Sequence, residues 1–371
     1  MPIPLLDLRA QHATIKDDVV RAIMGVVDAQ TFILGEPVSR FEAAVASLSH
    51  VTHAIGCANG TDAILLALRA LDAGRGDEVI TTPFTFFATA GAIHNVGARP
   101  VFVDIDPVTF NIDPTKIAAA VTPKTKAVIP VDLFGQMAPL EQVALSARGI
   151  PMIEVAALSI GARRAIDGEW RMAGESATIG TFSFFPSKNL GGYGDGGMMV
   201  TQDDAIARRL VRLRTHGGVK TYFHEEVGFN SRLDTLQAAV LEAKLPHLAA
   251  WSAKRREHAA YYTAGLADLA PDVRTPVVGP ESESIYNQYT IRAARRDALQ
   301  NHLKNLGIGT AIYYPLPLHL QPCFAYLGYR RGQFPEAERA SDEVLSLPVY
   351  PELSHTQQDE VIAAVRGFYG R

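Results

Sequence analysis

Short apolar runs, separated by segments of helical periodicity, repeat between residues 78 and 201 of the 371-residue chain. Strands that are hydrophobic on both faces belong to a mostly parallel sheet that helices cover. The repeat therefore predicts an α/β fold with a mostly parallel central sheet and helices on both of its faces. The predicted strands are residues 78–82, 100–104, 127–131, 151–155, 177–182 and 197–201.

The pattern changes near residue 250. Helical periodicity over residues 252–266 and 297–306 brackets an alternating stretch, residues 284–292, which predicts an edge-facing strand. The chain is long enough for one large α/β domain and a smaller one. We therefore expect a large cofactor-binding domain in residues 1–250 and a small α+β domain in residues 251–371.

The composition argues against several classes of partner. A net charge of −4 at pH 7 disfavours nucleic acid or an anionic membrane as the main partner. Cys57 and Cys323 lie far apart and lack metal-ligand spacing, which suits a reducing compartment and predicts no metal site. The N-terminus shows no signal-peptide pattern, and no apolar stretch reaches membrane-spanning length. We therefore expect a cytoplasmic protein.

A single lysine, Lys188, stands between a short apolar strand and a glycine-dense loop. Glycines let the backbone approach a bulky ligand closely, and the hydroxyls of Ser183 and Ser187 can donate hydrogen bonds to a phosphate. The lysine is either a counter-charge for the phosphate or an amine that forms a Schiff base with a carbonyl cofactor. A nucleotide P-loop is excluded, because no Gly-Lys-Ser/Thr tripeptide opens a helix here. The alternative is a flexible surface loop with an incidental lysine.

Two other segments carry groups that suit the same ligand. Residues 54–62 form a small-residue turn that opens a helix, and a helix N-terminus is a natural phosphate seat, although ordinary capping by Asn59 would look the same. Phe86 follows the first predicted strand, at the edge where open α/β sheets bind ligands, and could stack on a flat heterocycle. On its own, core packing is the simpler explanation for Phe86. Together the parts describe a pyridoxal phosphate site with a phosphate cup (Gly60, Thr61, Ser183), a ring platform (Phe86) and a Schiff-base lysine (Lys188).

These segments resemble the DegT/DnrJ/EryC1/StrS family of sugar aminotransferases, which have the fold type I aminotransferase architecture. The resemblance runs nearly end to end, and so many ordered matches are specific for the family. The subgroup that the chain resembles most acts on UDP-linked 3-keto sugars such as N-acetylated 3-oxo-glucuronates. The matching segments are residues 59–63, 84–86, 102–106, 183–188, 194–197, 214–217, 228–237, 313–317 and 345–348.

The resemblance implies an enzyme that uses pyridoxal 5′-phosphate and its pyridoxamine form. This enzyme would move an amino group from L-glutamate to a nucleotide-linked keto sugar. Lys188 would be the Schiff-base lysine and proton shuttle. Asn230 would reach the phosphate in the neighbouring subunit, so that a homodimer would share two sites. The other implied cofactor contacts are Gly60, Thr61 and Ser183 at the phosphate and Phe86 over the ring.

The resemblance also implies a substrate pocket. Arg232, Tyr314 and His319 fall where members of the family line their sugar-nucleotide pocket. For Arg232 an ion pair with Asp234 at the start of a helix explains the pattern equally well.

Two positions depart from the family at the edge of the cofactor ring. After Pro151 the family continues Glu-Asp-Ala-Ala-Gln, whereas residues 154–158 read Glu-Val-Ala-Ala-Leu here. Val155 therefore replaces the Asp that pairs with the pyridine nitrogen, and Leu158 replaces the Gln near the phenolic oxygen. Glu154 cannot take over, because adjacent strand residues point to opposite faces.

Three explanations of the two departures compete. The pocket is tuned for altered chemistry with a neutral pyridine ring, or the chain has lost catalysis and keeps only the binding of cofactor or sugar nucleotide. As a third explanation, a residue elsewhere in the chain restores a partner for the nitrogen. The sequence does not choose among them, and transamination of a nucleotide-linked keto sugar remains the leading hypothesis.

Overall fold

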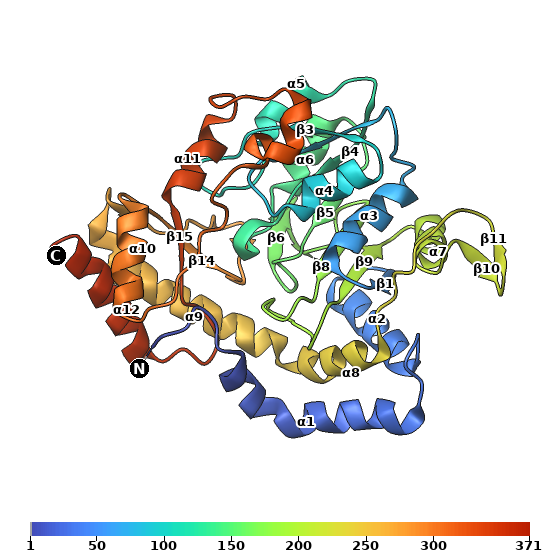
Figure 1. Ribbon diagram of the computed structural model, residues 1–371, viewed down its shortest axis with the longest axis horizontal. Helices are drawn as coiled ribbons and strands as arrows, with labels where there is room; N and C mark the ends of the chain where they lie inside the picture. The colour runs from blue at the N-terminus through green and yellow to red at the C-terminus, as the bar shows by residue number, and fades with distance from the viewer. Residues whose placement is uncertain (1) are drawn as a thin grey trace.

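A mostly parallel sheet lies at the centre of the molecule in a computed structural model that describes residues 2–371 (Figure 1). Met1 of the predicted large domain lies outside the described residues. Four strands form the order β1-β9-β8-β5 and three form the order β3-β2-β4. Parallel bridges Val128–Met152 and Val131–Val155 join the two groups. The strands are β1 (His53–Cys57), β2 (Glu78–Thr81), β3 (Arg99–Phe102), β4 (Thr125–Ile129), β5 (Ile153–Val155), β8 (Ile179–Ser183) and β9 (Gly197–Thr201).

Within this sheet β9 runs antiparallel to both of its neighbours, and the pairs β5–β8, β2–β3 and β2–β4 are parallel. Successive residues of β9 enter different hydrophobic clusters: Met199 belongs to one cluster, and Met198 and Val200 belong to another. Because adjacent strand residues point to opposite faces, both faces of the sheet are buried. The predicted α/β fold with a mostly parallel sheet is confirmed.

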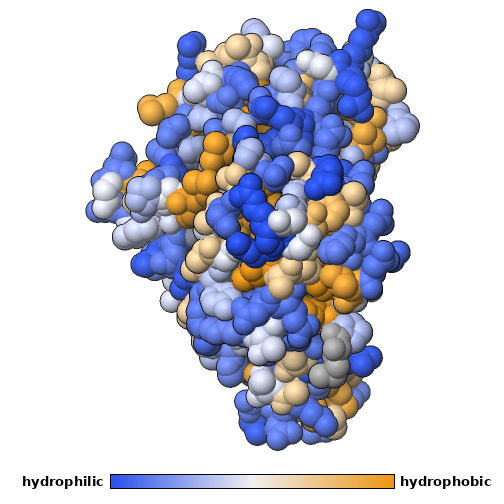
Figure 2. All heavy atoms as spheres, turned by 90° about the vertical axis from the view of Figure 1, so that its left-hand side faces the viewer, coloured by the Kyte–Doolittle hydropathy of each residue, from blue (hydrophilic) through white to orange (hydrophobic). Residues whose placement is uncertain are grey.

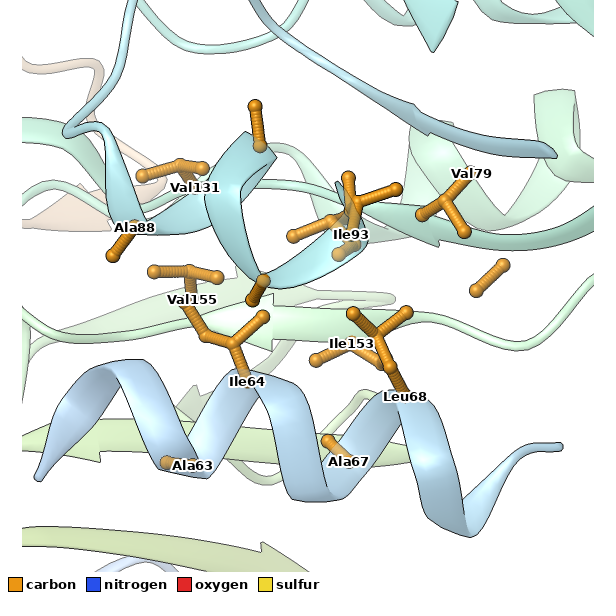
Figure 3. Packing of buried hydrophobic residues seen from close by; sticks show 14 of the residues in the cluster. Ala63, Ile64, Ala67, Leu68, Val79, Ala88, Ile93, Val131, Ile153 and Val155 are labelled. Atoms are coloured by element: carbon orange, nitrogen blue, oxygen red, sulfur yellow. The ribbon is translucent and has the colours of Figure 1, made fainter. Parts of the chain in front are cut away.

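Helices supply the apolar side chains that cover the sheet. Figure 3 shows Ile64 and Leu68 of one helix pointing toward Val155 and Ile153 of β5. That helix begins at Gly60, and Asn59 caps it by accepting a hydrogen bond from the Asp62 N–H. The helices of the first 250 residues are α1 (Leu8–Ala29), α2 (Glu36–Leu48), α3 (Gly60–Ala70), α4 (Ala88–Asn95), α5 (Ile117–Ala120), α6 (Leu140–Ala147), α7 (Asp204–Leu213) and α8 (Thr235–Lys244).

The C-terminal part of the chain builds a second sheet with its own hydrophobic cluster around Tyr262 and Tyr289. Its strand order is β12-β14-β15, and both pairs are antiparallel. The elements are α9 (Leu248–Leu266), β12 (Val273–Arg274), β14 (Tyr289–Ala293), α10 (Arg296–Asn305), α11 (Pro335–Glu343), β15 (Val344–Leu347) and α12 (His355–Phe368). The division of domains at residue 250 stays a prediction, and α9 runs through that position.

The predicted edge strand over residues 284–292 is wrong in two respects. Only its second half is a strand, β14, and β14 lies between β12 and β15 rather than at an edge. All five residues of β14 are buried. The polar residues of β14 that produced the alternation are paired inside the protein, because Thr290 hydrogen-bonds Ser346 and Arg292 donates to Glu343.

The sequence pattern did not predict two smaller strand groups. One is the antiparallel sheet β13-β6-β7, made of β6 (Arg163–Ile166), β7 (Glu169–Met172) and β13 (Ser282–Glu283). The other is the hairpin β10 (Gly218–Lys220) and β11 (Phe223–His224), which projects from the body of the molecule (Figure 1).

The outer surface is largely polar on the face that Figure 2 shows. Hydrophilic side chains cover most of this face, and apolar side chains gather in smaller patches between them. No helix within residues 2–371 combines the length and the apolar character needed to cross a membrane.

Candidate active site

A cavity of about 790 Å³ opens where several strands of the central sheet end. Val155 is the last residue of β5 and Ser183 the last of β8, and the turns after β1 and β2 supply Asn59 and Phe86. Open α/β sheets bind ligands at the carboxyl ends of their strands, so this position agrees with the fold. The lining residues are Asn59–Asp62, Ile64, Thr85, Phe86, Ala88, Thr89, Val131, Leu133, Val155, Ala157, Leu158, Ser183, Phe185, Ser187, Lys188, Asp195, Gln288, Tyr313 and Tyr314.

Lys188 lines this cavity rather than standing free in a surface loop. Burial lowers the pKa of its ammonium group to about 8. Removal from water disfavours the charged form of an amine, and only the neutral amine attacks a carbonyl. On the order of a tenth of the Lys188 side chains would therefore be neutral at pH 7, compared with far less than a hundredth for an exposed lysine.

The N-terminus of α3 forms a closely packed anion cradle beside Lys188. Asn59 Oδ1 accepts a hydrogen bond from the Asp62 N–H (2.8 Å), while the first N–H groups of a helix have no partner within the helix. A Cβ added to Gly60 would stand 2.6 Å from Ser183 Cβ, so the cradle leaves no room for a side chain there. The cavity-lining residues Gly60, Thr61, Ser183 and Ser187 offer N–H and hydroxyl donors, which suits a phosphate.

The wall of the cavity at the end of β5 is apolar. Val155 and Leu158 are only 4% and 7% exposed, and both line the cavity. Figure 3 shows Val155 between Val131 and Ile64, so that this wall continues directly into the hydrophobic core. Among the described residues that line the cavity, the carboxylates are Asp62 and Asp195. These two come from α3 and from the glycine-rich loop, not from β5.

Glu154 points away from the cavity, as strand alternation predicts. Its Oε2 accepts a hydrogen bond from the Gly174 N–H (3.0 Å), and it is fully buried together with Asp132. Asp132 in turn accepts hydrogen bonds from Ser159 Oγ (2.7 Å) and the Ala138 N–H (2.8 Å). Burial raises the pKa of Asp132 to about 6. Burial and then the charge of Asp132 raise the pKa of Glu154 well above its usual value. Both carboxyls therefore hold their protons more tightly than free carboxyls, and Glu154 lies behind the sheet rather than in the cavity, whose wall at β5 stays apolar.

Phe86 and Tyr314 face the cavity from different parts of the chain. Their ring centroids are 6.3 Å apart, and Phe86 is 59% exposed in the single chain. Tyr314 is partly buried, and removal from water raises the pKa of its hydroxyl. Phe86 therefore presents an open aromatic surface, and Tyr314 supplies a neutral hydroxyl group.

Three predicted site residues do not line this cavity. Asn230 is exposed and forms an isolated antiparallel β-bridge with Thr215. Arg232 lines a separate open hollow of about 950 Å³ next to the β10–β11 hairpin, and the ion pairs of residues 2–371 include none between Arg232 and Asp234.

The third residue, His319, is buried, with its Nε2 3.0 Å from Glu338 Oε1. Burial lowers the pKa of His319 although Glu338 opposes this shift.

Several of the lining residues were not among the predicted site residues. Asp195 and Tyr313 fall within the matching segments 194–197 and 313–317, so the family motif could have indicated them. Gln288 lay inside the stretch that was predicted to be an edge strand, and no local pattern indicated that its side chain reaches the cavity.

Comparisons with known proteins agree with this geometry. Residues 13–366 match the DegT/DnrJ/EryC1/StrS aminotransferase family. The chain belongs to this family. It is 52% identical over 372 residues to the pleiotropic regulatory protein of Geobacillus stearothermophilus, covering 100% of this chain and 99% of the relative.

Other relatives carry enzyme names. The chain is 45% identical over 366 residues to the UDP-N-acetyl-3-dehydro-α-D-glucosamine 3-aminotransferase of Acidithiobacillus ferrooxidans, covering 98% of this chain and 97% of that protein. The crystal structure of S. venezuelae DesV in complex with a ketimine intermediate superimposes with a TM-score of 0.96. This match has 40% identity and covers 100% of this chain and 99% of DesV. The family resemblance predicted from the sequence is confirmed.

Aminotransferases of this family depend on pyridoxal 5′-phosphate, and the cavity fits this cofactor in two of three respects. The cradle at Gly60 and Ser183 has the donors and the close approach that a phosphate needs, and Lys188 has a pKa that suits reaction with an aldehyde. The apolar wall at Val155 offers no partner to a protonated ring nitrogen.

Proposed function

We propose that the protein is a pyridoxal phosphate-dependent aminotransferase that moves an amino group from L-glutamate to a nucleotide-linked 3-keto sugar. The observation that carries the proposal is Lys188, whose amine has a pKa of about 8 and shares one cavity with the anion cradle at Gly60. The sugar class is supported by relatives whose names specify 3-dehydro-glucosamine and 3-oxo-glucuronate nucleotides.

The residues have separable tasks in this proposal. Gly60, Thr61 and Ser183 hold the phosphate, and Phe86 covers one face of the ring. Lys188 would hold the cofactor through its aldehyde group and, once the amine of the donor has displaced it, would carry a proton between the reacting carbon and the cofactor. When bound, the cofactor would supply an electron sink for the charge left as this proton leaves.

Val155 and Leu158 set the rate in this proposal. In the absence of a carboxylate the ring nitrogen stays unprotonated, since an opposite charge shifts such a pKa by about 1–3 units. If that stabilisation acted fully in the transition state, its loss would slow the reaction roughly 10- to 1000-fold. We therefore propose a slow aminotransferase that works with a neutral ring.

A second candidate is a protein that binds cofactor or sugar nucleotide without turnover and acts in regulation. The apolar wall at Val155 and Leu158 favours it, and so does a relative that is named a pleiotropic regulatory protein. The two candidates differ in one measurable respect, namely whether L-glutamate loses its amino group to the bound cofactor.

We also propose a cytoplasmic homodimer that shares two sites. Asn230 is exposed and outside the cavity of its own chain, which suits a role in the neighbouring subunit. Phe32, Ile33 and Leu34 are between 38% and 49% exposed, and such a run is a candidate for burial against a second copy. Arg232 and His319 remain predicted substrate residues, which a dimer with bound sugar nucleotide would test.

The test of the proposed function starts with reconstitution of the protein with pyridoxal 5′-phosphate, borohydride reduction and peptide mapping. We expect the adduct on the peptide that contains Lys188. We then expect the reconstituted protein to convert L-glutamate to 2-oxoglutarate in a single turnover. An adduct on Lys188 without any 2-oxoglutarate would favour the binding protein. No adduct on Lys188 would contradict the aminotransferase and leave only a protein that binds sugar nucleotide.

A further inference from the structure

Residues 284–288, called the strap here, connect β13 to β14 and are fixed against the loop that follows β4. Ser284 Oγ and the Ile285 N–H both donate to the Gly135 carbonyl oxygen, each at 3.0 Å. Gly135 has φ +104°, and a Cβ there would stand 2.8 Å from Asn287 N. Only glycine allows the strap to lie this close.

The strap is also fixed to the segment that carries Lys188. Asn287 Nδ2 donates to Oδ1 of Asn189, the residue after Lys188, at 2.7 Å. Arg255 is fully buried and donates from Nη1 to the carbonyl oxygens of Tyr286 (3.2 Å) and Asn287 (3.3 Å). The backbone of residues 284–287 is thus held from both sides. This fixes the position from which the side chain of the last strap residue, Gln288, extends.

Gln288 borders the cavity and carries a buried polar atom. It lines the same cavity as Lys188, and its Oε1 is buried and has no hydrogen-bond partner among residues 2–371, so a rotation of the carboxamide would turn it toward a ligand. A buried polar atom without a partner costs about 1–3 kcal/mol. The cost of such a group disappears when a ligand completes its hydrogen bonds. In a mostly apolar pocket, the small number of polar groups usually determines which ligand binds.

The place of Gln288 in the cavity separates it from the cofactor contacts. The anion cradle comes from α3 and from the end of β8, whereas Gln288 comes from the strap before β14 and lines the cavity together with Tyr313 and Tyr314. Gln288 also borders a narrow crevice beside Phe134. A polar group from this separate part of the chain suits a second ligand better than the cofactor phosphate.

We propose that Gln288 is a sugar-contacting residue whose carboxamide hydrogen-bonds to a hydroxyl or acetamido group on the sugar of the nucleotide-linked substrate. The inference rests on the proposed function, because it takes the second ligand to be a nucleotide sugar. It goes beyond that function by assigning recognition of the sugar, as distinct from the nucleotide, to the strap.

The test compares two probes on the protein reconstituted with pyridoxal 5′-phosphate. The probes are UDP-N-acetyl-D-glucosamine and UDP, and their affinities are measured by titration calorimetry. We expect Gln288→Leu to lower the affinity for UDP-N-acetyl-D-glucosamine about tenfold, which corresponds to the loss of one net hydrogen bond. The affinity for UDP should stay unchanged. The matched control is Gln136→Leu, because Gln136 borders the crevice but not the cavity.

Each other outcome contradicts a defined part of the account. Equal binding of the sugar probe by the wild type and Gln288→Leu would overturn the inference, and so would equal weakening of both probes. A wild type that binds UDP but gains nothing from the sugar would also overturn it. Failure of the wild type to bind either probe would contradict the nucleotide-sugar part of the proposed function and the inference with it. Conversion of L-glutamate by the wild type, which involves no sugar, is measured in parallel and tests the aminotransferase part separately.

Discussion

The two ends of the cavity differ in what they require from a ligand. At the α3 end, Gly60 is packed against Ser183, and N–H and hydroxyl donors of Gly60, Thr61, Ser183 and Ser187 suit an anion. At the β5 end, Val155 and Leu158 continue the hydrophobic core and offer a ligand no hydrogen-bond partner from their side chains. In the proposed function, binding of the cofactor and activation of its ring would therefore be carried by different residues. A change at one end of the cavity would leave the other end intact.

The largest effect is expected from the residue that joins the two ends. Lys188→Ala should lower amino transfer from L-glutamate by on the order of a thousandfold or more, because it removes both the nucleophile and the proton carrier. The anion cradle is untouched, so equilibrium dialysis should still detect bound pyridoxal 5′-phosphate. The control is Lys254→Ala, an exposed lysine in an ion pair with Glu257. Full activity of Lys188→Ala would show that Lys188 takes no part in the reaction.

The β5 end is tested by Val155→Asp, with the uncharged Val155→Thr as its matched control. A carboxylate here would pair with a protonated ring, so single-turnover transfer from L-glutamate should accelerate at least about tenfold. Adding Leu158→Gln should accelerate it further. The same carboxylate would face Val131 and Ile64 in the absence of cofactor, and should then cost several kcal/mol of stability in a denaturant titration.

The α3 end is tested by Gly60→Ala. A Cβ at this position meets Ser183 Cβ at 2.6 Å, so the affinity for pyridoxal 5′-phosphate should fall roughly 10- to 100-fold. Gly25→Ala in α1 is the control, because nothing lies within 4 Å of its added Cβ. The control should bind the cofactor normally and gain about 0.5–1 kcal/mol of stability from better helix propensity. Equal cofactor affinity in the two variants would show that the cradle is not the phosphate site.

The smallest effect concerns the carboxyl pair behind the wall. The folded-state pKa of Asp132 is raised to about 6, above its usual value of 3.8, so the stability that this group contributes is present below pH 4 and lost as the pH rises through 6. Asp132→Asn should flatten this dependence of the unfolding free energy by on the order of 1–3 kcal/mol. Denaturant titrations at pH 4, 5, 6 and 7 measure it, with the exposed Asp167→Asn as control. An unchanged slope in Asp132→Asn would mean that Asp132 is ionised throughout.

Local motifs predicted most of the anion end of the cavity. Gly60, Ser183 and Lys188 lie in short segments whose chemistry is visible along the chain, and the repeat of apolar runs predicted the sheet that brings them together. The position of Val155 on the cavity could be predicted as well, because strand alternation fixes which side chains of β5 lie on one face of the sheet. The structure adds that the neighbouring Glu154 is engaged with Gly174 on the other face.

The other parts of the site depend on contacts between distant segments. The strap takes its shape from Gly135, which lies 149 residues before Ser284, so no pattern within residues 284–292 distinguishes it from a strand. β6 begins with two arginines, Arg163 and Arg164, and β7 alternates charged and apolar side chains, so neither strand contains an apolar run as long as those of the central sheet. Asn230 and Arg232 lie outside the cavity of the single chain. The predicted role of Asn230 depends on a second copy, and the predicted contact of Arg232 with the sugar nucleotide stays a prediction.

The most direct test of the account is one turnover of the wild-type protein with L-glutamate after reconstitution with pyridoxal 5′-phosphate. The rate of 2-oxoglutarate release is followed by rapid quench in the wild type and in Val155→Asp. We expect about one 2-oxoglutarate for each Lys188 that binds cofactor, released more slowly by the wild type than by Val155→Asp. A wild type that binds cofactor at Lys188 and releases no 2-oxoglutarate would contradict the proposed aminotransferase. A wild type at least as fast as Val155→Asp would contradict the role given to the apolar wall.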